Sequence, residues 1–188
     1  MKLIKPKFWD HKNLISLSLF PLSLIIQLFI FFKKKFTKVS NFKIPIVCIG
    51  NIYIGGTGKT PLSILVAKEL SKIGKKPAII RKYYKDHKDE HSLIKENFNY
   101  LILNSNRISA IQEAENKNFD TAILDDGFQD YKIKKNLSII CFNSNFEGNG
   151  FVIPAGPLRE NLSSIKNAQI MIINGYKNLK FEKKILDI

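Results

Sequence analysis

The stretch that most restricts how this chain can fold is GNIYIGGTGKTP, residues 50–61. The apolar run IPIVCIG before it is typical of a strand buried on both faces. The segment TPLSILVAKELSKIG after it has the spacing of a helix that ends at Gly74. A glycine-rich turn between such a strand and helix can direct backbone N–H groups at an anion. The stretch therefore predicts a phosphate-binding loop, or P-loop, in an α/β domain.

The P-loop pattern assigns separate roles to its residues. Lys59 is expected to reach the β and γ phosphates of a nucleotide, and the Thr60 hydroxyl to bind Mg²⁺. The pattern usually has a glycine five residues before Gly58, where this chain has Tyr53. A glycine turn without a ligand is the alternative, but it would not need a lysine and a threonine here. The predicted nucleotide-binding residues are Gly55, Gly56, Thr57, Gly58, Lys59 and Thr60.

A second strand pattern ends in acidic residues. Asp125 and Asp126 follow the apolar segment TAIL. Ligands of parallel α/β sheets bind at the carboxyl ends of the strands, so these carboxylates are expected near the P-loop. Either can hold Mg²⁺ directly or through water. The predicted metal site consists of Thr60, Asp125 and Asp126.

Alternating strand and helix patterns fill the rest of the chain and predict a mostly parallel sheet with helices on both faces, the α/β fold of P-loop NTPases. We expect two parts, an anchoring segment over 1–40 and a P-loop lobe over 41–188. Strands are expected at 44–50, 77–81, 99–103, 120–125, 137–143 and 168–174. Helices are expected at 59–73, from about residue 89, at 106–117 and, briefly, after PAGPLRE.

Residues 13–32 are almost wholly apolar, uncharged and flanked by lysines on both sides. A helix of that length rises roughly 30 Å, enough to cross a bilayer core. Ser16, Ser23, Gln27 and Lys34 fall on one stripe, which fits a helix lying in the membrane interface or packing that side on its own domain. Spanning, interfacial and buried core helices remain alternatives, and a cleaved signal peptide fits least. Trp9 is expected among the lipid headgroups.

The composition favours an anionic partner. The net charge is +14, from 30 Lys and Arg residues against 16 Asp and Glu. Only three of these cations are arginines, which argues against nucleic acid because guanidinium groups read bases and phosphates best. Cys48 and Cys141 lie in apolar runs and are expected to be buried thiols of a reducing compartment.

The motifs GNIYIGGTGKTP, DDGFQ, GNGFVIPAGPLRE and IING together resemble the tetraacyldisaccharide 4′-kinase family of lipid A synthesis. In that family Tyr53 is typical of the loop. The resemblance implies an ATP- and Mg²⁺-dependent kinase at the cytoplasmic face of the bacterial inner membrane. It would phosphorylate the 4′-hydroxyl of a tetraacylated glucosamine disaccharide 1-phosphate. Its other expected partner is the phospholipid surface of the inner membrane.

The resemblance also assigns residues outside the P-loop. Asp89 matches the family's catalytic aspartate, which helps deprotonate the attacking hydroxyl. Lys59 is the second catalytic residue and acts at the phosphates. A solvated surface charge is the alternative for Asp89. Glu90, Gln129 and Arg159 would lie near the substrate, and Arg159 could instead pair with an acid such as Glu160.

The chain departs from the family at two places. The segment IIRKYYKDHKDE lacks two glycines and is short, and Asp130 replaces a histidine. The family also continues past IING into a second lobe that supplies a histidine partner for the aspartate, and we expect that lobe to be missing. A membrane-attached P-loop protein that binds nucleotide without turnover is therefore the alternative. A basic lipid-surface or nucleic-acid-binding protein with an empty loop is a third.

Overall fold

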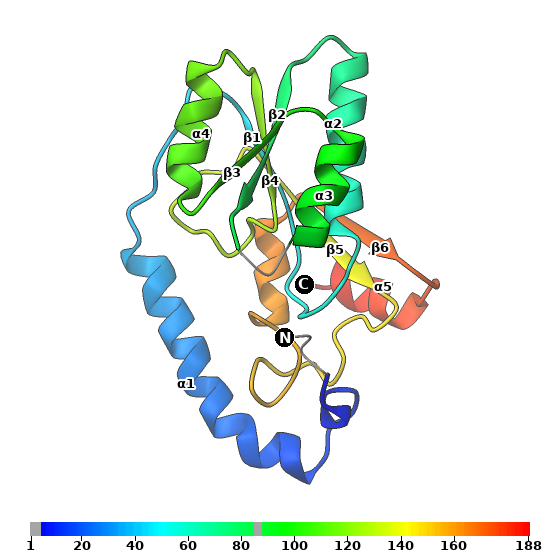
Figure 1. Cartoon of the computed structure of the whole chain (residues 1–188). Coiled ribbons are helices and arrows are strands. Elements are labelled where there is room, and N and C mark those ends of the chain that lie inside the picture. The colour runs from blue at the N-terminus through cyan, green and yellow to red at the C-terminus, as the bar shows by residue number, and fades with distance from the viewer. Residues whose placement is uncertain (1–4, 85–87) are drawn as a thin grey trace. The chain divides into compact units, whose positions relative to one another are not determined.

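The computed structural model describes residues 5–84 and 88–188. Its strands form a six-stranded sheet in the order β3-β2-β4-β1-β5-β6, with helices between them (Figure 1). The strands are β1 (Ile46–Gly50), β2 (Pro77–Lys82), β3 (Leu101–Asn104), β4 (Thr121–Asp125), β5 (Leu137–Asn143) and β6 (Ile170–Asn174). The helices are η1 (Lys7–Trp9), α1 (Leu14–Phe36), α2 (Lys59–Lys72), α3 (Lys88–Asn97), α4 (Arg107–Asn116), η2 (Leu162–Asn167) and α5 (Leu179–Leu186).

The chain divides into two compact units. Unit 1 comprises Met1–Thr37, Asn51–Thr57 and Ile140–Ile188, and unit 2 comprises Lys38–Gly50 and Gly58–Ile139. The sequence prediction did not assign residues 51–57 and 140–188 to the same unit as α1. Amino-acid composition does not reveal where a chain returns to an earlier unit.

Unit 2 contains the parallel strands β1 to β4, with α2 and α3 on one face and α4 on the other (Figure 1). At the centres of β2 and β4, Ile79, Ile80, Ile123 and Leu124 have no exposed surface, as expected for strands covered on both sides. At the carboxyl end of β4, Asp125 lies opposite Ile49 of β1 and Arg81 of β2. This register brings the ends of three strands to one edge.

Cys48 and Cys141 are free, buried thiols, as predicted. Burial raises the pKa of Cys48 to about 11. The thiol therefore stays protonated at neutral pH and behaves as a small apolar side chain.

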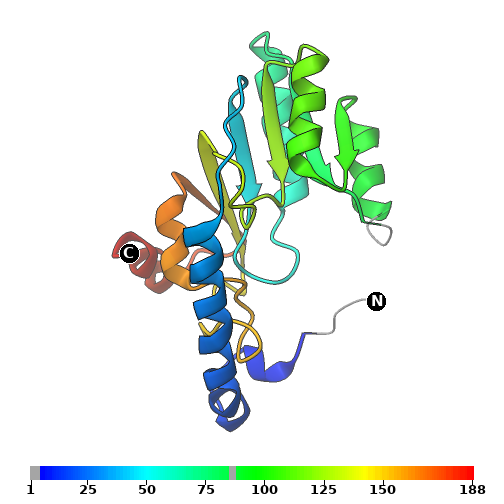
Figure 2. The same cartoon turned by 90° about the vertical axis from the view of Figure 1, so that its left-hand side faces the viewer.

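Helix α1 belongs to unit 1 (Figure 2), and the predicted polar stripe contacts other residues of that unit. Ser16 and Ser23 have no exposed surface. The Ser23 hydroxyl donates to the carbonyl oxygen of Val152 at 2.7 Å and accepts from the N–H of Ala155 at 3.1 Å. Further along, Gln27 accepts a hydrogen bond from Asn161, and Lys34 forms an ion pair with Glu160.

The remaining surface of α1 is apolar and open. The helix is long and apolar enough to cross a membrane, and only 11% of its most apolar window is buried among the described residues, which does not favour the core-helix alternative. The exposed apolar residues are Leu14, Ile15, Leu17, Leu22, Leu24, Ile25, Leu28, Phe29, Phe31, Phe32 and Phe36.

Two details differ from the sequence prediction. Trp9 is buried rather than placed for headgroups, because its indole N–H donates to the carbonyl oxygen of Pro154 at 3.0 Å. Helix α5 was not predicted, although Asn178 caps it and Phe181 and Ile185 are buried one turn apart. Of the segment between β2 and α3, predicted as a variable loop, residues 85–87 lie outside the described part of the chain.

Candidate functional site

The first half of the P-loop lies in unit 1 and has the features of an anion-binding turn. Gly55 has φ of 132°, a conformation that favours glycine. A Cβ on Gly56 would meet nothing within 4 Å, so packing in this chain does not require glycine there. The Thr57 hydroxyl oxygen is buried and has no hydrogen-bond partner among the described residues. An open glycine beside a buried, unsatisfied hydroxyl fits close approach of a polar ligand.

Two asparagines shape this half of the loop, and sequence reasoning missed both. The Asn51 amide donates to the carbonyl oxygens of Tyr53 and, at 3.3 Å, Gly55. Asn143, at the end of β5, donates to the Gly56 carbonyl at 2.8 Å. These bonds engage carbonyl oxygens of the turn rather than its N–H groups, as expected of a loop whose N–H groups serve an anion.

Tyr53 replaces the usual first glycine because the loop here pairs with another segment of unit 1. Tyr53 forms an antiparallel bridge with Leu158, and its side chain is buried. The flanking bonds run from Ile54 N–H to the Pro157 carbonyl at 2.9 Å and from Arg159 N–H to the Ile52 carbonyl at 2.6 Å. An extended, paired backbone accepts any L-residue, so glycine is not needed at this position.

The second half of the P-loop begins helix α2 in unit 2. Gly58 is the N-cap residue and has φ of 82°, in the left-handed region where glycine is favoured. The first residues of the helix follow directly, so their N–H groups and the positive end of the helix dipole lie at Lys59 and Thr60. The local fold therefore presents a lysine, a hydroxyl and a helix N-terminus together.

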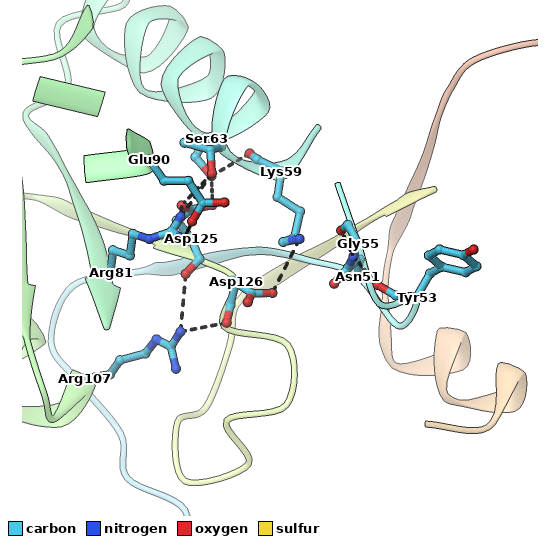
Figure 3. Close-up of polar contacts among 11 residues, drawn as sticks. Asn51, Tyr53, Gly55, Lys59, Ser63, Arg81, Glu90, Arg107, Asp125 and Asp126 are labelled. Atoms are coloured by element: carbon cyan, nitrogen blue, oxygen red, sulfur yellow. Dashed lines mark hydrogen bonds and ion pairs between the residues drawn. The ribbon is translucent and has the colours of Figure 1, made fainter. Parts of the chain in front are cut away.

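Asp125 is the centre of the polar cluster in unit 2 and has no exposed surface (Figure 3). The Thr60 hydroxyl donates to Asp125 Oδ2 at 3.0 Å, and the Ser63 hydroxyl lies 3.1 Å from Asp125 Oδ1. Arg81 pairs with the same carboxylate and also donates to Thr60 Oγ1 at 3.1 Å. A buried carboxylate is stable only with such compensation.

The rest of the cluster consists of charges around that centre (Figure 3). Arg81 also pairs with Glu90 of α3, and Lys59 Nζ lies 3.8 Å from Asp126 Oδ1. Arg107 donates to the carbonyl oxygen of Asp126 at 2.7 Å and lies 3.6 Å from Asp130. The structure thus brings Lys59, Thr60, Glu90, Asp125 and Asp126 into one connected network.

The other predicted residues take no part in the contacts named above. Asp89 is exposed in the first turn of α3, directly before Glu90. Gln129 is half-buried in the turn after β4. Arg159 is half-buried in unit 1, as the residue before Glu160, whose carboxylate pairs with Lys34. Gly55, Gly56 and Thr57 also belong to unit 1.

The residues present fit a magnesium ion. Thr60 and Asp125 supply a hydroxyl and a carboxylate, the hard oxygen ligands that Mg²⁺ prefers, and Asp126 adds a partly exposed carboxylate. The Asp125 charge is neutralised in this structure by a cation, the guanidinium of Arg81. A divalent cation bound to the same oxygens would supply the positive charge that Arg81 supplies here.

Known proteins match this chain along most of its length. It is 47% identical over 178 residues to a tetraacyldisaccharide 4′-kinase of Pelagibacter ubique, covering 93% of this chain and 56% of that protein. It is 35% identical to the kinase of the same name from Wigglesworthia glossinidia brevipalpis, covering 89% and 53%. The chain therefore spans about half the length of these relatives.

A solved structure shows the same fold. The "apo" form of LpxK from Aquifex aeolicus in complex with ATP superimposes with a TM-score of 0.75 at 25% identity. The match covers 86% of this chain and 59% of that one. The sequence profile of the tetraacyldisaccharide-1-P 4′-kinase family matches residues 15–186. With a profile match over nearly the whole chain and a P-loop whose lysine and threonine face two aspartates, this chain belongs to the tetraacyldisaccharide-1-P 4′-kinase family.

Proposed function

We propose that the chain binds ATP and Mg²⁺ and acts as a kinase of lipid A biosynthesis. The reaction transfers the γ-phosphate of ATP to the 4′-hydroxyl of a tetraacylated glucosamine disaccharide 1-phosphate. The observation that carries this proposal is the hydrogen bond of Thr60 Oγ1 to the buried Asp125 carboxylate, at the helix that Gly58 and Lys59 begin. Family membership supports the choice of acceptor.

In the proposed mechanism the P-loop positions the donor. The N–H groups of residues 55–58 bind phosphate oxygens, and Lys59 bonds the β and γ phosphates. Thr60, Asp125 and Asp126 would hold Mg²⁺, and the bound ion would neutralise charge on the phosphates. Ser63 contacts Asp125 Oδ1 and keeps that carboxylate oriented.

The acceptor side is assigned to the residues around α3. Asp89 is exposed, so it is accessible to a lipid-linked sugar, and it would take the proton of the attacking hydroxyl. Glu90 is bound to Arg81 next to it. Gln129 and Arg159 are proposed to contact substrate, with Arg159 suited to a phosphate group.

We further propose that α1 attaches the chain to the cytoplasmic face of the inner membrane by lying in the interface. Its buried serines and the Lys34–Glu160 pair support this choice, because a spanning helix would have to carry these polar contacts into lipid. The apolar face opposite them is exposed and suited to the acyl boundary. The donor ATP is a cytoplasmic compound, which sets the side.

Phosphate transfer from ATP to a micelle-dispersed disaccharide 1-phosphate should be measured with the purified chain and with Asp89→Asn. We expect transfer by the parent and a loss of roughly 10²–10⁴-fold in the variant, the usual contribution of general base catalysis. Glu96→Gln, an exposed acid of the same helix, is the matched control and should retain transfer. ATP binding without transfer would favour a nucleotide-binding protein without turnover, and absence of both would reject the proposal.

Replacing Phe29, which is exposed on α1, by glutamate should weaken binding to anionic phospholipid vesicles. Loss of one buried aromatic side chain costs about 1.5–3 kcal/mol, and that equals roughly a 10–100-fold loss of affinity. Vesicle co-sedimentation measures the change. Ile73→Glu, at an equally exposed position after α2, should bind as the parent does. Equal binding by both variants would show that α1 is not the membrane contact.

A further inference from the structure

Arg81 occupies the oxygens that a metal ion would need. Its guanidinium contacts Asp125 Oδ2 and Thr60 Oγ1, the carboxylate and the hydroxyl assigned to Mg²⁺. The side chain is only 6% exposed, so bulk water does little to screen its charge from the cluster. Both contacts come from Nη1, the same nitrogen atom.

A guanidinium and a magnesium ion cannot hold these oxygens together. Mg²⁺ binds oxygen at about 2.0–2.1 Å in a nearly octahedral shell. A cation already hydrogen-bonded to the same two atoms would lie within a few ångströms of it, and like charges at that distance repel strongly. Metal entry therefore requires Nη1 to leave Asp125 and Thr60.

The second contact of Arg81 gives the guanidinium a place to go. Its other terminal nitrogen, Nη2, pairs with Glu90 Oε2. Glu90 belongs to α3 and has 47% of its side chain exposed, whereas Asp125 is fully buried. The guanidinium thus connects a buried carboxylate to a half-exposed one, and it can release the first while keeping the second.

We propose that Arg81 is a positioning residue that closes the metal site in the absence of nucleotide, and that Glu90 retains Arg81 when Mg²⁺ takes Thr60 and Asp125. The inference rests on the proposed function for the identity of the metal. It has a consequence for binding order. The metal alone must displace Arg81, whereas the triphosphate brings negative charge that lowers the cost of displacement, so Mg²⁺ and ATP bind cooperatively.

The test is the dissociation constant of Mn²⁺, used as a probe for Mg²⁺ and measured by electron paramagnetic resonance without nucleotide or lipid. Arg81→Gln should bind Mn²⁺ at least about tenfold more tightly than the parent, because a competing cation is removed. Glu90→Gln should bind Mn²⁺ more weakly, because the variant lacks the carboxylate that holds Arg81 when it leaves Asp125. In the Arg81→Gln background the Glu90→Gln change should have little further effect.

Arg107→Gln is the matched control for charge. Arg107, the first residue of α4, also contacts the carboxyl end of β4. It donates to the backbone carbonyl oxygens of Asp125 and Asp126, not to the Asp125 carboxylate. If this variant raises Mn²⁺ affinity as much as Arg81→Gln does, a general field effect explains the result and the proposal is wrong. Raising the salt concentration should shrink a field effect but not the direct competition of Arg81.

A second readout separates this inference from the proposed function. ATP affinity is measured with and without Mg²⁺, and the ratio should fall in Arg81→Gln because metal no longer depends on ATP to displace the arginine. Circular dichroism and urea unfolding confirm that each variant is folded. Unchanged Mn²⁺ affinity in a folded Arg81→Gln protein that still binds ATP would overturn the inference and leave the proposed function intact. Failure of the parent to bind ATP would refute the function instead.

Discussion

Lys59→Ala is expected to reduce phosphate transfer by roughly 10²–10³-fold, the usual effect of removing one donor to a developing charge in a protected site. The Lys59 side chain is 12% exposed, and its ammonium lies 3.8 Å from Asp126. It is therefore held at the start of α2, where no neighbouring cation of the same helix turn can replace it. ATP binding, measured by calorimetry, should weaken in parallel.

Lys68→Ala provides the matched control for this variant. Lys68 lies two turns later on α2 and is exposed, so its removal changes the charge by the same amount without touching the P-loop. It should leave ATP affinity and transfer within a factor of about two. ATP binding that survives Lys59→Ala unchanged would mean that the P-loop is not the nucleotide site.

Asp125→Ala should lower the free energy of unfolding by about 3–5 kcal/mol, the cost of leaving a buried charge without its partner. The substitution removes the buried carboxylate that pairs with the guanidinium of Arg81, and it removes a partner from the hydroxyls of Thr60 and Ser63. Urea unfolding followed by circular dichroism measures the effect. Metal binding should be lost as well, since the central carboxylate is gone.

A substitution at Asp126 tests whether burial of the carboxylate causes the loss of stability expected for Asp125→Ala. Asp126→Asn removes a group with 28% of its side chain exposed, paired with Lys59 at 3.8 Å, and should cost less than about 1 kcal/mol. Replacing Asp125 and Arg81 together by leucine and methionine should recover much of the stability, because both members of the buried ion pair are then gone. A small cost for Asp125→Ala would show that water reaches Arg81 in the variant.

The order of strands and helices in the P-loop lobe followed from local patterns. Buried parallel strands are continuous apolar runs, and glycine, proline and asparagine mark the turns between them, so β1, β2, β4 and β5 were predicted within a few residues. Helix α5 was missed although its local signals are present: Asn178 is a typical N-cap, and Phe181 and Ile185 are spaced one helical turn apart. The return of residues 140–188 to the unit of α1 depends on long-range packing, which a local pattern does not contain.

The site was predictable where one motif carries several residues. Lys59 and Thr60 are adjacent in one pattern, and Asp125 follows a recognisable strand. Ser63 and Arg81 were not assigned to the site, because a serine inside a helix and an arginine at a strand end have many uses. Arg81 meets Asp125 only through the register of β2 with β4, across 44 residues of sequence.

If α1 lies in the membrane interface as proposed, its buried residues Ser16 and Ser23 also restrict the orientation of the chain on a bilayer. Because Ser23 both donates to Val152 and accepts from Ala155, the helix cannot roll about its long axis without breaking two buried hydrogen bonds. A membrane-attached helix fixed in this way has one rotation about its long axis relative to unit 1. Leu28 and Phe29 are then always among the exposed apolar residues. Unit 1 would then keep a constant tilt to the membrane plane, and each lipid diffusing past would meet the same edge of the protein.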